Sequence, residues 1–153
     1  MALFLAQHGK SRPKDVDPEQ GLSPEGIAEV ERVATSTRQQ GLQIGRIVYS
    51  TKKRARQTAE IFATALKPAR GVQEQEGLKP LDDPAAFAAT IAETDDLLVV
   101  GHLPFMEKLV SYLVTGSMEP AVLKFINGGI VCLDRDPTAN RWFVRWTIVP
   151  RLA

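Results

Sequence analysis

Short, mostly apolar runs alternate along much of the chain with longer stretches in which apolar side chains recur every three or four positions. The short runs lie at residues 3–6, 46–50 and 97–101, and we predict each as a buried strand. Ser23 suits an N-cap, Pro24 a first helical position and Gly41 a helix end. The longer stretches predict amphipathic helices, at residues 24–40, 53–66, 84–93 and 105–114.

The C-terminal part of the chain predicts β structure. Residues 122–126 and 130–134 flank Asn127-Gly128-Gly129, a sequence typical of a hairpin turn. Residues 142–149 alternate roughly, as one more strand would, with Trp142 and Trp146 spaced for one strand face. Strands that alternate with helices predict an α/β fold, with a mostly parallel sheet and helices on both faces. The terminal segments can add antiparallel edge strands.

Length and composition exclude several classes of protein. The chain has 153 residues, 44% hydrophobic and 24% charged, which suits a single domain over residues 1–153. A net charge of +1 excludes a polyanion-binding protein of the histone type. Cys132 is the only cysteine, so no intrachain disulfide forms and a reducing compartment is expected. We see no signal peptide and no apolar run near the ~20 residues of a membrane span, and expect a cytoplasmic protein without a membrane partner.

Both histidines of the chain follow an apolar run. His8 comes after the first predicted strand and His102 after the third, while Ser50 ends the second and Arg54 lies about one helical turn later. Ligands of open α/β sheets bind beyond the carboxyl ends of the strands. We therefore expect these four side chains to meet at one rim of the sheet.

The chemistry of this set points to phosphoryl transfer. A neutral imidazole is nucleophilic near pH 7 and can take a phosphoryl group covalently. Arg54 supplies a fork of donors for phosphate oxygens, and a second imidazole, if protonated, can stabilise developing charge. Gly9 lets the backbone approach a ligand. Further basic residues would attract an anion, namely Lys10, Arg12, Lys52, Lys53 and Arg56.

Each residue also has a simpler interpretation. A lone histidine after a strand is usually a polar loop residue, and Ser50 can cap the following helix instead of contacting phosphate. Lys53 and Arg56 suit a solvated helix start, and Gln57 and Thr58 a supporting role. Two histidines and one distant cysteine lack the spacing of a zinc site. Few aromatic residues accompany the basic ones, so we expect no nucleic-acid partner.

The motifs resemble those of a known superfamily. His8-Gly9 resembles the Arg-His-Gly motif of the histidine phosphatase (phosphoglycerate mutase-like) superfamily, and Gly101-His102 resembles its second histidine motif. Residues 50–59, STKKRARQTA, are similar to its Ser-x-x-x-Arg-Ala-x-Gln-Thr. The short chain and His102-Leu-Pro are most similar to the SixA-type phosphohistidine phosphatases.

The resemblance implies a three-layer α/β sandwich and no metal or organic cofactor. It implies that His8 is the nucleophile, and that Arg54 and His102 bind the phosphoryl group and stabilise the transition state. One position departs from the pattern, because Gln7 stands where the superfamily has arginine. Losing a charged donor costs ~2–4 kcal/mol of transition-state stabilisation, and Lys10 is the candidate to restore the charge. We expect activity to be retained but altered.

Three functions remain open. The leading one is hydrolysis of phosphohistidine on a protein, such as a histidine-containing phosphotransfer domain. A phosphatase for small phosphate esters is the second, and it needs a proton donor for the alkoxide, for which Glu76, Asp82 and Asp83 are the candidates. The third is a phosphate- or phosphoprotein-binding module whose catalysis Gln7 impairs. In each of them Gln7, Gly9, Lys10 and Ser50 are candidate substrate-binding residues.

Overall fold

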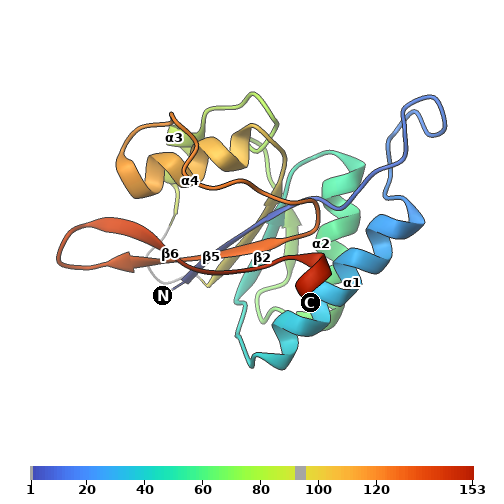
Figure 1. Ribbon diagram of the computed structural model, residues 1–153, viewed down its shortest axis with the longest axis horizontal. Helices are drawn as coiled ribbons and strands as arrows, with labels where there is room; N and C mark the ends of the chain where they lie inside the picture. Colours follow the sequence, from blue (N-terminus) through green and yellow to red (C-terminus); the bar gives the residue numbers. More distant parts are fainter. Residues whose placement is uncertain (1, 92–95) are drawn as a thin grey trace.

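A six-stranded mixed sheet forms the centre of the protein (Figure 1). The computed structural model describes residues 2–91 and 96–153. The strand order is β3-β2-β4-β1-β5-β6. The first four strands in this order pair in parallel, and β5 and β6 extend the sheet as antiparallel strands. The bounds are β1 Ala2–Gln7, β2 Arg46–Tyr49, β3 Val72–Glu74, β4 Leu97–Gly101, β5 Ile130–Asp136 and β6 Arg141–Ile148.

Helices cover both faces of the sheet, which completes the three-layer α/β sandwich expected from the sequence (Figure 1). On one face lie α1 (Pro24–Gln39) and α2 (Lys53–Leu66), and on the other α3 (Pro84–Ala88) and α4 (Phe105–Thr115). A short 3-10 helix, η1 (Pro150–Leu152), packs beside α1. No helix among the described residues has the length and apolar character that crossing a bilayer requires.

The sheet divides the core into two clusters. In β1, Leu3 and Leu5 pack with the α3–α4 side, while Phe4 and Ala6 pack with the α1–α2 side. The side chains alternate in this way because successive residues of a strand point to opposite faces of the sheet. Every residue of β4 is buried, as befits a parallel strand covered on both faces. The carboxyl ends of β1, β2 and β4 therefore meet at one rim.

The predicted hairpin around Asn127-Gly128-Gly129 is wrong. Residues 122–126 form no strand, and the hairpin of this region is β5–β6, which turns at residues 137–140. Gly128 has a φ of +76°, and its N–H points back to the carbonyl oxygens of Gln7 and His8. The turn-forming sequence thus serves the rim of the sheet rather than a hairpin.

Two smaller expectations also fail. The helix expected over 84–93 ends at Ala88, because Thr90 turns back to bond the carbonyl of Phe87 through both its N–H and its hydroxyl; residues 92–93 lie outside the described residues. Trp142 and Trp146 do not share a face. Arg145 is an extra residue opposite β5. This bulge places Trp142 against the α3–α4 side of the core and Trp146 against the α1–α2 side.

Candidate active site

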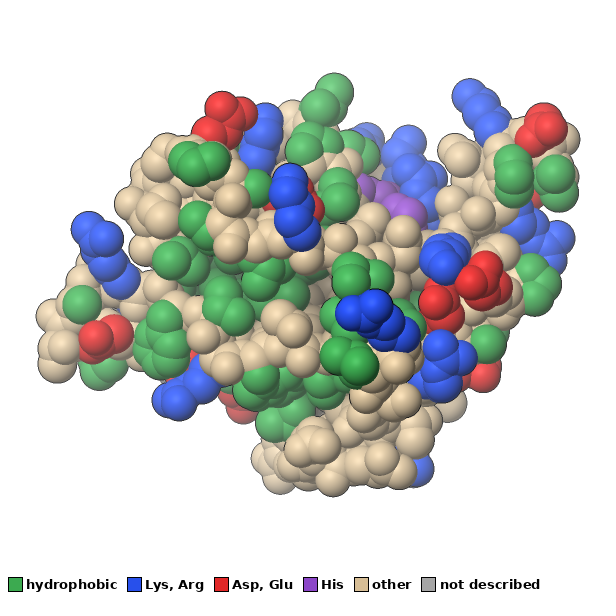
Figure 2. Space-filling model, viewed as in Figure 1, with side chains coloured by type: hydrophobic (Ala, Val, Ile, Leu, Met, Phe, Trp, Pro, Cys, Tyr) green, Lys and Arg blue, Asp and Glu red, His purple; other side chains and the backbone are tan. Residues whose placement is uncertain are grey.

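Strand pairing brings the two histidines together. Gln7 and Gly101 are partners in the parallel β1–β4 pair, and the N–H of His8 donates to the carbonyl of Gly101 at 3.0 Å. The residues that follow this pair are His8 and His102, whose ring centroids lie 5.0 Å apart. Figure 2 shows histidine side chains at the rim, beside lysine and arginine. The expectation that both histidines reach one rim is confirmed.

The imidazole of His8 is held in one tautomer. Its Nδ1 lies 2.7 Å from the carbonyl oxygen of Gly9, and because that oxygen can only accept, Nδ1 carries the proton. Nε2 is then unprotonated. Burial lowers the pKa of His8, the hydrogen bond to Gly9 opposes this, and the charge of Arg54 lowers the pKa further. His8 is therefore neutral at pH 7, with the lone pair of Nε2 available.

His102 lies deeper, with only 1% of its surface exposed. Its Nε2 lies 2.8 Å from Oγ of Ser50, while its Nδ1 is buried without a partner. Burial first, and then the charges of His8, Arg54 and Lys52, lower the pKa of His102 to about 3. If the Ser50 hydroxyl donates to Nε2, Nδ1 is left with an unused N–H donor. Ser50 does not cap α2, whose N-cap is Lys52.

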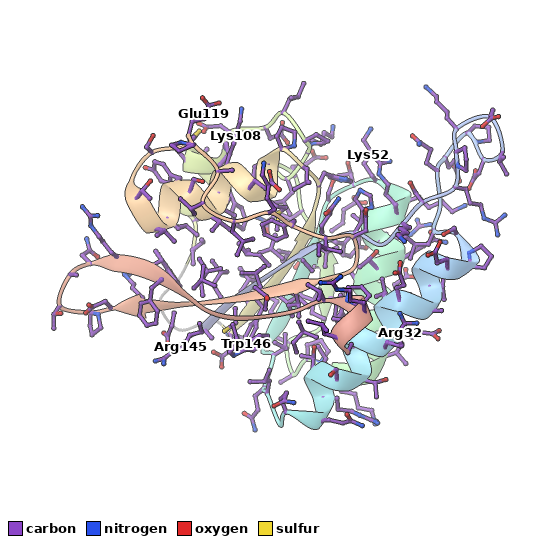
Figure 3. The ribbon with its side chains drawn as sticks, viewed as in Figure 1. Arg32, Lys52, Lys108, Glu119, Arg145 and Trp146 are labelled. Atoms are coloured by element: carbon purple, nitrogen blue, oxygen red, sulfur yellow. The ribbon has the colours of Figure 1, made fainter. Side chains whose placement is uncertain are left out.

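Arg54 makes the site positive. It belongs to the first turn of α2 and is half-buried, and among the described residues no carboxylate forms an ion pair with it. Burial lowers the pKa of Arg54, and the guanidinium stays charged at pH 7. Lys52 lies at the same end of the molecule, where α2 begins (Figure 3). An anion entering here meets one unpaired guanidinium and two neutral imidazoles.

The remaining candidate binding residues are placed differently. Gln7 is 8% exposed, and its Oε1 is buried without a hydrogen-bond partner. Gly9 faces α1, where an added Cβ would lie 2.7 Å from Cγ2 of Val30, so packing requires this glycine. Lys10 bonds Glu25 at 2.9 Å. The structure therefore does not bring the charge of Lys10 to the histidine pair.

The candidate proton donors serve local structure. Asp82 accepts from the N–H of Lys79, and Asp83 caps α3 by accepting from the N–H of Ala85. Glu76 is exposed. The three carboxylates line a cavity of about 320 Å³ whose lining residues include neither histidine. Within the described residues, no group of three His, Cys, Asp or Glu side chains is arranged to hold a metal ion.

The backbone of His8 and Gly9 forms hydrogen bonds that are not evident in the sequence. The amide Nδ2 of Asn127 donates to the carbonyl oxygen of His8 at 3.1 Å, and the N–H of Gly128 reaches the same oxygen at 3.2 Å. The hydroxyl of Thr58 accepts from the N–H of Gly9 at 3.0 Å. The supporting role expected of Thr58 is thus seen, whereas the sequence offered only a turn signal for Asn127.

Comparison with known proteins identifies the family. The family model described as Histidine phosphatase superfamily (branch 1) matches residues 3–82, just over half of the chain. This chain belongs to the histidine phosphatase superfamily. The matched segment holds His8, Ser50 and Arg54, while His102 lies beyond it. The chain is accordingly a phosphatase of this superfamily.

Similar proteins of the superfamily span nearly the whole chain. Phosphohistidine phosphatase SixA of Escherichia coli (strain K12) is 27% identical over 156 residues, covering 98% of this chain and 94% of that protein. The structure of the protein histidine phosphatase SixA complexed with tungstate superposes with a TM-score of 0.83 at 24% identity, covering 99% and 98% of the two chains.

Two further solved structures share the fold. The putative phosphohistidine phosphatase SixA from Agrobacterium tumefaciens gives a TM-score of 0.79 at 25% identity, with 97% of each chain covered. Phosphoserine phosphatase from Entamoeba histolytica, in complex with 3-phosphoglyceric acid, gives 0.76 at 17% identity, with 99% of each covered. Together these findings confirm the resemblance and the α/β fold class.

Proposed function

We propose that this phosphatase hydrolyses phosphohistidine through a covalent intermediate on His8. The observation that carries the proposal is the orientation of that imidazole. The hydrogen bond from Nδ1 to the Gly9 carbonyl leaves Nε2 free as a nucleophile, beside the unpaired Arg54 and the unpartnered Nδ1 of His102. The similarity to SixA proteins supports the same substrate class.

The reaction takes two displacements. In the first, the lone pair of His8 Nε2 forms a bond to phosphorus while the bond from phosphorus to the substrate's imidazole nitrogen breaks. That nitrogen keeps the bonding pair and takes a proton from water. In the second, a water oxygen attacks phosphorus, the bond to His8 Nε2 breaks and returns its pair to the ring, and the water's proton passes to solvent. Inorganic phosphate leaves, and His8 is restored.

Two side chains would stabilise the transferring group. The guanidinium of Arg54 matches two phosphoryl oxygens. His102, kept neutral by burial, would donate from Nδ1 when Ser50 donates to its Nε2. Phosphoryl transfer depends mainly on such positioning and charge stabilisation. Gln7 would add a neutral amide where other members have a cation, so we propose slower turnover rather than loss of activity.

The leaving group favours a phosphoramidate over an ester. Asp82 and Asp83 are occupied with backbone N–H groups, so neither stands ready to protonate an alkoxide, whereas an imidazole nitrogen takes its proton from solvent. We therefore propose a phosphorylated protein, such as a histidine-containing phosphotransfer domain, ahead of a small phosphorylated substrate. We further propose that residues 1–153 act as one domain in the cytoplasm without a cofactor.

The test compares two substrates on the same preparation. Phosphate release from a phosphohistidine-bearing protein should exceed release from p-nitrophenyl phosphate at equal concentration, and the trapped phosphoenzyme should be acid-labile and alkali-stable. Faster turnover of the ester would favour a small-molecule phosphatase. Binding of inorganic phosphate without turnover of either substrate would favour a binding module, the alternative that Gln7 in place of the superfamily's arginine raises.

A further inference from the structure

We infer that Asn127 is a positioning residue that holds the backbone of His8 in place for nucleophilic attack. The inference rests on the proposed role of His8. The peptide group between His8 and Gly9 is fixed on both sides. Its carbonyl accepts from Nδ2 of Asn127 at 3.1 Å, and its N–H donates to Oγ1 of Thr58 at 3.0 Å.

The hydrogen bond from Asn127 is not duplicated by its neighbour. The N–H of Gly128 is shared between the carbonyl of Gln7 at 3.0 Å and that of His8 at 3.2 Å. A shared donor interacts weakly with each acceptor. Without the Asn127 amide, the carbonyl of His8 retains only the longer half of this shared bond.

The segment that carries Asn127 is itself anchored to α4. The hydroxyl of Ser111 donates to the carbonyl of Pro120 at 3.0 Å and accepts from the N–H of Val122 at 3.2 Å. Closer to Asn127 in this segment, the N–H of Phe125 donates to the carboxylate of Glu107 in α4 at 3.1 Å, and the Phe125 side chain is buried in the core. Asn127 thus reaches His8 from a fixed base on the opposite side of the sheet from Thr58.

This peptide group controls where the nucleophile points. Nδ1 of His8 bonds the carbonyl of Gly9, and Gly9 has no Cβ to restrict its backbone. If the peptide between His8 and Gly9 rotates, the Gly9 carbonyl moves, and the imidazole and its Nε2 move with it. Misplacement of a reacting atom slows the chemical step more than it weakens binding. Among the described residues Asn127 has no hydrogen bond to Arg54 or His102, so we expect these two side chains to stay in place.

The test uses Asn127→Ala and the isosteric Asn127→Asp, which has the same shape but no amide donor. The control, Ile126→Ala, alters the neighbouring side chain, which is 49% exposed. We expect both Asn127 variants to form the phosphoenzyme about tenfold more slowly, equivalent to ~1.4 kcal/mol of barrier. The inhibition constant of inorganic phosphate should stay within about twofold, and the control should match the unsubstituted chain in both.

Two further measurements distinguish misplacement of His8 from a general loss of folded structure. The ¹⁵N resonances of His8 should shift in the Asn127 variants and not in the control, while the thermal midpoints of all folded variants agree. A wild-type rate in Asn127→Asp, or an equal loss of rate and phosphate affinity, would overturn the inference while leaving the role of His8 intact. Failure of the unsubstituted chain to form a phosphoenzyme at His8 would instead contradict the proposed function, and the inference with it.

Discussion

Acid should destabilise the folded protein because the imidazole of His102, buried in the fold, is protonated first in the unfolded chain. The folded-state pKa is about 3, against an ordinary value of 6.5, chiefly because the imidazole is buried. The unfolded chain therefore binds the proton first as the pH falls. The contribution of the neutral imidazole to stability is complete above about pH 6.5 and is lost progressively towards pH 3.

The magnitude follows from linkage. At pH 4 the unfolded imidazole is about 2.5 pH units below its pKa, while the folded one remains mostly neutral. At 1.36 kcal/mol for each pH unit, the free energy of unfolding falls by ~3 kcal/mol between pH 7 and pH 4 on account of this residue.

The assay is urea denaturation at a series of pH values, with His102→Gln as the comparison. Gln lacks a titrating group, and its amide can reach the position of Nε2 and keep a hydrogen bond to Ser50. We expect the unsubstituted chain to lose ~3 kcal/mol more than the variant between pH 7 and pH 4. Parallel pH curves for the two chains would refute the buried, neutral state of His102.

Three further predictions concern turnover, pH and packing. Gln7→Arg should raise kcat/KM for a phosphohistidine substrate by about two to three orders of magnitude, the effect of a restored charged donor; steady-state kinetics measures it, and an unchanged value would contradict the account of Gln7. Because the pKa of His8 is lowered from 6.5, the midpoint at which kcat/KM falls on the acid side, where the imidazole protonates, should lie below pH 6.5; a midpoint above pH 6.5 in the pH profile would contradict this. Gly26→Ala would place a Cβ 2.1 Å from the carbonyl oxygen of Lys10, so urea denaturation should show a loss of ~2 kcal/mol or more, and an unchanged midpoint would oppose it.

The meeting of the two histidines could be predicted from the sequence because it depends on the topology of the sheet alone. Parallel strands deliver whatever follows them to one edge, and the apolar runs before His8 and His102 identified those strands. The bounds of α2 were also predictable, because Pro68 cannot continue a helix. In the structure the helix ends at Leu66, and Lys67 adopts a left-handed conformation.

The remaining features could not be predicted from local sequence patterns, because they depend on pairing between residues far apart in the chain. The bulge at Arg145 moves the register of β6 by one residue, and nothing in the local alternation of 142–149 signals it. Asn127-Gly128-Gly129 carries a hairpin signal, yet its donors are taken by Gln7 and His8, more than a hundred residues earlier in the chain. Lys10 was expected near the phosphoryl group, but its pairing with Glu25 depends on where α1 packs.

The central claim is that His8 takes the phosphoryl group. The most direct measurement is phosphate release from a phosphohistidine-bearing protein by the unsubstituted chain and by His8→Ala, each checked for folding by circular dichroism. The account predicts turnover by the unsubstituted chain, with acid-labile phosphate on His8, and none by the variant. Equal release by the two chains would contradict it.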